Sequence, residues 1–140
     1  MNEFQALTHD EQKSIFHYLN ELLPYKELIL SKKKFILVHA GIENFSPTKE
    51  LSDYKIEELI FNKPFYYLKY FNDKILVTGH TPTRYIVEEE LNLPIGIVDK
   101  SGHKYDNIYK ANNHIAIDCG CGYGGLLGAI RLDDLQEFYV

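Results

Sequence analysis

Two histidines, His39 and His80, each follow a short apolar run typical of a buried strand and precede small residues. The runs are residues 35–38 and 75–77, and Gly79 and Pro82 mark the point where the second strand should end. Ligands of α/β proteins bind in the crevice beyond the carboxyl ends of strands, so imidazoles placed there can bind a ligand. Taken separately, each histidine could equally be a turn residue without chemistry.

A third segment, residues 115–125, repeats the pattern of an apolar run followed by a glycine-rich turn. The three motifs are Val-His-Ala-Gly at 38–41, Thr-Gly-His-Thr-Pro at 78–82, and Ile-Asp-Cys-Gly at 117–120 with Gly124 and Gly125. In this order and spacing they resemble the carboxyl half of the calcineurin-like metallophosphoesterases. The resemblance is closest to the bacterial branch of the phosphoprotein (serine/threonine) phosphatases.

The resemblance implies a metal-dependent phosphoester hydrolase with two divalent ions, most naturally Mn²⁺, with Fe or Zn as alternatives. The histidines matching His39 and His80 bind the second ion in that family, so their ring nitrogens should lie roughly 3 to 3.5 Å apart. Lys63 stands where the family usually has an arginine that holds substrate phosphate, and it could equally be a lysine at a helix end. Asp118 should accept hydrogen bonds from backbone donors, or support a metal-binding histidine.

Other signatures of the family are absent from the sequence: Gly-Asp-x-His-Gly, Gly-Asp-x-x-Asp-Arg-Gly and Gly-Asn-His-Glu. We therefore expect the carboxyl-terminal half of an α/β/β/α sandwich with a mixed sheet, in a truncated chain that binds at most one metal ion weakly. Such a chain should be nearly inactive alone, and no catalytic acid or base is assigned to it. Surface exposed by the truncation should form an apolar patch that favours self-association or recruits an amino-terminal segment.

The sequence is compatible with three functions. The first is a phosphatase acting on a phosphorylated substrate, most simply a phosphoprotein. The second is a dinucleoside tetraphosphate hydrolase, which shares the same motifs. The third is a non-catalytic remnant that acts as a binding module. A phosphoserine peptide and diadenosine tetraphosphate distinguish the first two as substrates.

The composition is that of an ordinary globular domain. The chain has 140 residues, of which 45% are hydrophobic and 25% charged, so residues 1–140 should form one α/β domain. A formal net charge of -5 does not favour nucleic acid or an anionic membrane as partner. The amino terminus lacks a secretory signal, which predicts a cytoplasmic protein, and Cys119 and Cys121 should be free thiols.

The local patterns predict elements on both sides of the histidines. A capping box at Thr8 and Glu11 begins a helix that ends near Pro24, with its apolar stripe in the core. Residues 27–38 predict a hairpin with residues 31–34 at its tip. Ser52 should cap a helix that ends near residue 62. The remaining expectations are a short helix at 65–71, strands at 84–90, 95–98, 107–109, 115–117, 126–132 and 136–140, and a turn at Asn113 and His114.

Overall fold

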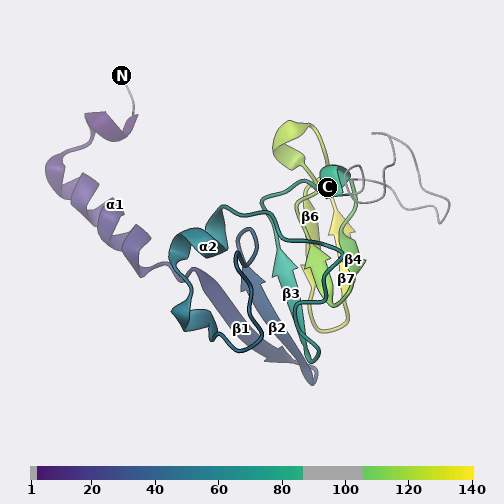
Figure 1. Ribbon diagram of the computed structural model, residues 1–140. Helices are drawn as coiled ribbons and strands as arrows, with labels where there is room; N and C mark the ends of the chain where they lie inside the picture. Colours follow the sequence, from purple (N-terminus) through teal and green to yellow (C-terminus); the bar gives the residue numbers. More distant parts are fainter. Residues whose placement is uncertain (1–2, 87–105) are drawn as a thin grey trace.

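The computed structural model describes residues 3–86 and 106–140, and within them a five-stranded mixed sheet dominates (Figure 1). The strand order is β1-β2-β3-β5-β4. The parallel strands β2, β3 and β5 form the middle of the sheet, and β1 and β4 pair antiparallel at its two edges. The strand bounds are β1 Tyr25–Leu30, β2 Lys33–Val38, β3 Lys74–Thr78, β4 Tyr109–Ala111 and β5 His114–Ala116. The α/β class is therefore observed.

The hairpin of β1 and β2 forms as predicted, because its turn chemistry suits a tight connection. Ser31 and Lys32 both have positive φ angles, 47° and 66°, which match the twist of a two-residue hairpin turn. The register pairs Leu30 with Lys33 and Tyr25 with Val38. The tip is thus only two residues long, and the following lysines belong to β2.

Each face of the sheet has its own apolar core, because successive strand residues point to opposite faces. On one face, Ile36, Val38 and Leu76 pack with residues of the segment between β2 and β3. On the other, Phe35, Val77 and Ile115 pack with residues of a separate hairpin, formed by β6 (Gly128–Arg131) and β7 (Gln136–Tyr139). The two strands of this hairpin were both predicted.

Helix α1 (His9–Glu21) begins at the predicted capping box. The Thr8 amide donates to Glu11 Oε2 at 2.8 Å, and the Glu11 amide donates to Thr8 Oγ1 at 3.3 Å. The prediction that its apolar stripe lies in the core is wrong, since no residue of α1 is buried. The helix projects from the sheet as an arm (Figure 1), and its apolar stripe is partly exposed. A short 3₁₀ helix, Glu3–Ala6, precedes it.

The helices after β2 differ from prediction. Ser52 lies inside a 3₁₀ helix, Leu51–Asp53, and α2 (Ile56–Ile60) begins later, where the Lys55 amide donates to the Glu58 carboxylate at 2.8 Å. Residues 65–71 are not helical, because Pro64 and the hydrogen bond from the Phe65 amide to the buried Tyr70 hydroxyl (2.8 Å) hold an irregular loop.

Residues 83–86 form a helical turn instead of a strand, with the Tyr85 amide bonded to the Pro82 carbonyl at 2.9 Å. The rest of the predicted strand at 84–90, and the one at 95–98, lie outside the described residues. Strand β4 lies two residues later than predicted, and β5 one residue earlier. In the part of the chain that the structure describes, every helix is too short or too polar to cross a membrane.

Candidate metal-binding site

His39 and His80 meet because β2 and β3 are parallel neighbours that end side by side. Leu37 pairs with Val77 in the sheet, so each histidine leaves its strand at the same edge. The His39 Nε2 atom lies 3.2 Å from His80 Nδ1, and the ring planes meet at 64°. The predicted convergence of the two rings is confirmed.

The backbone around the pair is tightly specified. The Gly79 amide donates to the His39 carbonyl at 2.9 Å, which extends the β2–β3 ladder beyond the strands. His80 itself adopts φ 65°, a left-handed conformation that costs a side-chain-bearing residue roughly 1–2 kcal/mol. This conformation turns the His80 ring back toward His39, and strain of this kind is often found at functional positions.

The spacing of the two nitrogens fits the binding of one metal ion. If both lie about 2.1 Å from a shared ion, a separation of 3.2 Å corresponds to a ligand angle of about 100°. That value lies between the octahedral and tetrahedral angles. Both rings are exposed, and no third histidine, cysteine or carboxylate of the described ranges joins them in a cluster. Within 3–86 and 106–140, the pair therefore supplies two neutral ligands.

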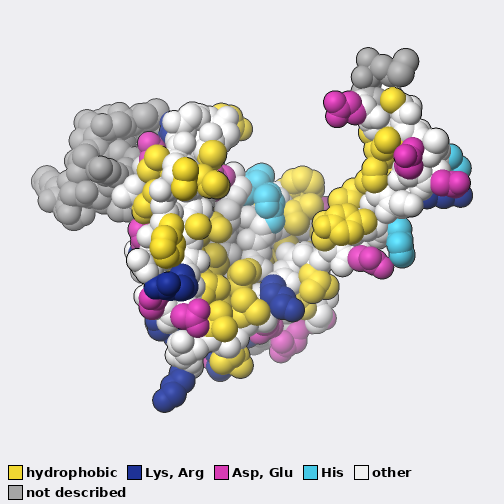
Figure 2. All heavy atoms as spheres, turned by 180° about the vertical axis from the view of Figure 1, so that it is seen from behind, with side chains coloured by type: hydrophobic (Ala, Val, Ile, Leu, Met, Phe, Trp, Pro, Cys, Tyr) yellow, Lys and Arg dark blue, Asp and Glu magenta, His cyan; other side chains and the backbone are white. Residues whose placement is uncertain are grey.

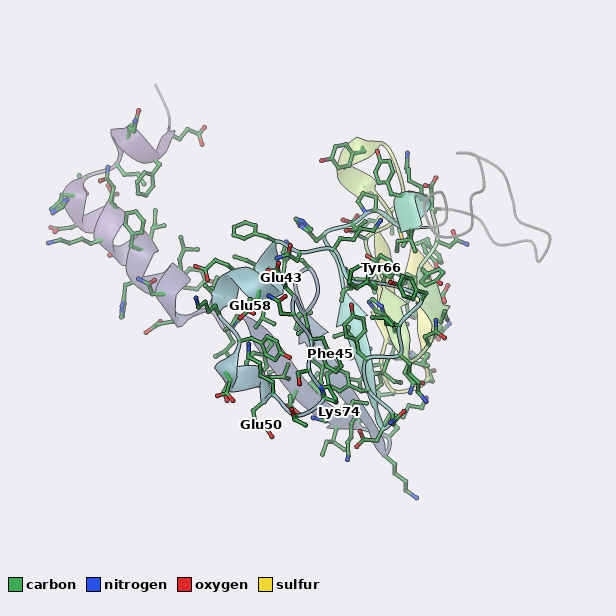
Figure 3. The ribbon with its side chains drawn as sticks, in the orientation of Figure 1. Glu43, Phe45, Glu50, Glu58, Tyr66 and Lys74 are labelled. Carbon is green, nitrogen blue, oxygen red and sulfur yellow. The ribbon has the colours of Figure 1, made fainter. Side chains whose placement is uncertain are left out.

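A third histidine, His114, is buried on strand β5, next to β3. His114 Nε2 is 2.8 Å from Thr78 Oγ1, and its ring stacks on Tyr66 with centroids 4.9 Å apart. Figure 3 shows Tyr66 and Phe45 on the segment that crosses this face of the sheet. Burial lowers the pKa of His114 to about 4, so it is neutral at pH 7.

The turn predicted at Asn113 and His114 is correct for Asn113, which has φ 57°. It is wrong for His114, which is the first residue of β5 and only 1% exposed. Sequence reasoning missed this residue, because an asparagine-rich turn before a strand indicates where the strand begins but not which side chains face the core. The apolar residues that follow His114 were the only signal for its strand position.

Asp118 organises the glycine-rich turn, as one of its two interpretations predicted. Its Oδ1 atom accepts from the Gly120 amide at 2.9 Å, and its carbonyl accepts from the Thr83 amide at 2.8 Å. Arg84 begins the segment predicted as a strand at 84–90, but it lies in the helical turn, where its guanidinium lies against Gly120 and pairs with Asp106 at 3.0 Å. The segment after His80 is thus tied to the turn after β5.

Lys63 lies in a segment that packs directly against the His39 motif. A Cβ atom at Gly41, two residues beyond His39, would lie 2.7 Å from the Asn62 carbonyl oxygen and 2.9 Å from the Pro64 nitrogen. This close approach explains why glycine occupies position 41. The Lys63 Nζ atom lies 5.9 Å from the centre of the Tyr66 ring. Its predicted role toward phosphate stays a prediction.

The two cysteines are free thiols, as predicted, with Cys119 buried and Cys121 exposed. Burial and the neighbouring Asp118 raise the pKa of Cys119 to about 11, so this thiol is protonated and unreactive at pH 7. Neither cysteine belongs to a metal-ligand cluster in the described ranges.

A scan against protein-family models found no match, and a search of curated proteins found no significant match.

Proposed function

We propose that the chain is part of a metal-dependent phosphoester hydrolase of the serine/threonine phosphoprotein phosphatase type. The observation that carries the proposal is the separation of 3.2 Å between His39 Nε2 and His80 Nδ1 at the ends of adjacent parallel strands. The three motifs that resemble the calcineurin-like phosphoesterases contain both histidines. The five-stranded mixed sheet is compatible with half of an α/β/β/α sandwich.

In this proposal, His39 and His80 hold one of two divalent ions, with Mn²⁺ as the first candidate and Fe or Zn as alternatives. When bound, two such ions supply an activated hydroxide and neutralise charge on the phosphoryl oxygens. The two histidine rings are held in a fixed orientation, because the Gly79 hydrogen bond and the left-handed backbone of His80 leave little freedom in the strand ends. Lys63 is the candidate that meets substrate phosphate, as a point charge without the two-pronged geometry of arginine.

Two neutral imidazoles do not suffice for this chemistry, which needs bridging carboxylates and a general acid. We propose that these groups come from another polypeptide segment that carries the absent family motifs. The 140-residue chain alone should then bind one ion weakly and hydrolyse phosphoesters poorly.

The metal assignment is tested by titrating the purified chain with Co²⁺ or Mn²⁺ and following binding by calorimetry and by broadening of histidine NMR signals. One weak site is expected, and His39→Ala and His80→Ala should each abolish it. His17→Ala is the matched control, because His17 is an exposed histidine on α1 away from the pair. Binding that survives both site variants would refute the assignment.

The reaction is tested by adding, in trans, a polypeptide that carries the three absent motifs and assaying p-nitrophenyl phosphate hydrolysis with Mn²⁺. Activity should require both polypeptides and should be lost with His39→Ala. Comparing a phosphoserine peptide with diadenosine tetraphosphate then separates the phosphatase from the dinucleotide hydrolase. Metal binding without hydrolysis in any combination would favour the non-catalytic binding module.

A further inference from the structure

The apolar stripe of α1 is partly exposed in the described fold. Ile15, Leu19 and Leu22 lie on one side of the helix and are 37%, 51% and 52% exposed. Phe16, on the same side, is 57% exposed and makes an edge contact with Phe4. Figure 2 shows hydrophobic side chains on the side of this arm that faces the body across an open hollow.

A helix of this kind needs packing to be stable. At 13 residues α1 is at the length where isolated helices are marginal in water, even with a good capping box. Its stability therefore depends on covering the stripe. Monomeric proteins rarely leave a contiguous apolar surface of this size exposed, and such surfaces usually mark interaction sites.

A complementary surface lies at the base of the arm. It is a groove of about 600 Å³ whose floor includes Leu37, Val77 and Ile117 from the sheet. Its walls include Leu22 from α1 and Ile56 from α2, and it extends to His39. The groove is thus apolar, open, and continuous with the edge of the sheet that carries the histidine pair.

In this structure, α1 of the same chain does not fill the groove. The last turn of α1 already forms one wall of the groove, and an extended Leu22 (ψ 131°) followed by Pro24 directs the helix away from the sheet. The distal part of the stripe, at Ile15 and Phe16, therefore lies beyond the groove of its own chain.

We propose that a second copy of the chain covers the groove, with the two copies exchanging their α1 arms around a two-fold axis. Each arm places Ile15 and Phe16 in the groove of the other copy. The two-fold symmetry therefore buries the α1 stripe and the groove of both copies. The charges of the arm and of the groove are also opposite in sign. The arm carries Asp10, Glu11 and Glu21 against the single basic residue Lys13, while Lys26 is the lysine that lines the groove.

The test is the concentration dependence of the mass, measured by sedimentation on the purified full chain. A monomer–dimer equilibrium is expected, and Ile15→Glu should raise the dimer dissociation constant at least about tenfold, because a charge would enter an apolar groove. His17→Glu is the control, since it adds a negative charge to the opposite, exposed side of α1 and should leave the constant within about twofold.

A groove variant completes the test. Ile56→Glu should weaken the dimer similarly without unfolding the chain, because Ile56 is 50% exposed and an acid at the start of a helix is favourable. Mixing the Ile15→Glu and Ile56→Glu chains should form a heterodimer more readily than either variant dimerises alone, although less readily than wild type, because one of its two arm–groove contacts is intact. The His39 ring signals should shift on dimerisation, because His39 lines the groove.

Three outcomes would overturn the proposal. One is a chain that stays monomeric at every concentration. Another is association that His17→Glu weakens as much as Ile15→Glu. The third is a mixture of the arm and groove variants that dimerises no better than either alone, which would indicate that arms contact arms instead of grooves.

Discussion

His114 Nε2 and Thr78 Oγ1 form a hydrogen bond of 2.8 Å between β5 and the last residue of β3, and both side chains are only 1% exposed. Thr78 is followed by Gly79, whose amide binds the His39 carbonyl, and then by His80. The buried bond therefore fixes the end of β3 that positions His80, and the Gly79 amide links this strand end to His39 at the end of β2. A polar pair at this depth contributes specificity because each partner would lose hydrogen bonding if the strands shifted.

The first prediction concerns acid stability. The pKa of His114 falls from 6.5 to about 4 in the folded chain, because burial disfavours the charged ring. The unfolded chain therefore binds this proton first, and the free energy of unfolding should decrease by about 3 kcal/mol as pH falls from 6.5 to 4. Above pH 6.5 both states are neutral at this position and the contribution is constant.

Replacing His114 by Phe removes the titrating group. The variant should lose stability less steeply over the same pH range in urea unfolding experiments, although it should be less stable at pH 7, because Thr78 loses its partner. His17→Phe serves as the control, because the His17 ring is exposed to solvent whereas the His114 ring is buried. Parallel pH profiles for wild type and His114→Phe would contradict the assignment.

The second prediction concerns the backbone strain at His80. Because φ is 65°, glycine suits the position better than alanine, so His80→Gly should be about 1 kcal/mol more stable than His80→Ala. At Glu57, in the helix α2, the order should reverse, with glycine the less stable variant. Urea unfolding of the four variants gives the comparison. Equal stabilities at position 80 would show that the left-handed conformation is not strained there.

The third prediction separates two glycines of the turn after β5. A Cβ atom at Gly125 would lie 2.1 Å from the Cys119 carbonyl oxygen, whereas one at Gly122 meets no atom within 4 Å. Gly125→Ala should therefore lower the free energy of unfolding by more than about 2 kcal/mol. Gly122→Ala should change it by less than about 1 kcal/mol in either direction. Similar effects of both substitutions, measured by thermal unfolding, would contradict the close packing of this turn.

The fourth prediction concerns Lys63 and rests on the proposed function. In the assay with both polypeptides, Lys63→Ala should lower kcat/KM and leave the metal affinity of the chain unchanged, because the lysine meets phosphate and not metal. Lys63→Arg should keep the activity or raise it, since its planar group binds phosphate in a two-pronged manner. Lys13→Ala on α1 is the control for loss of a surface charge. Unchanged turnover in Lys63→Ala would indicate that Lys63 is an ordinary surface residue without a role in phosphate binding.

Local chemistry was sufficient to predict several elements. The capping box at Thr8 and Glu11, the hairpin ending at Val38, and the strands that lead into His39 and His80 all depend on residues close in sequence. The convergence of the two rings was expected from the resemblance to the metallophosphoesterases, and the parallel pairing of β2 and β3 in the structure brings it about.

What local patterns could not determine was which surfaces meet. The periodicity of α1 shows that one side is apolar but not what covers it, so its exposure became apparent only in the tertiary structure. The burial of His114 likewise depends on Tyr66 and Thr78, which come from distant segments. The sequence alone thus determined strand ends, turns and caps through short-range hydrogen bonding and sterics. Only long-range packing decided which histidine is buried, which pair is exposed, and which helix is left without a neighbour.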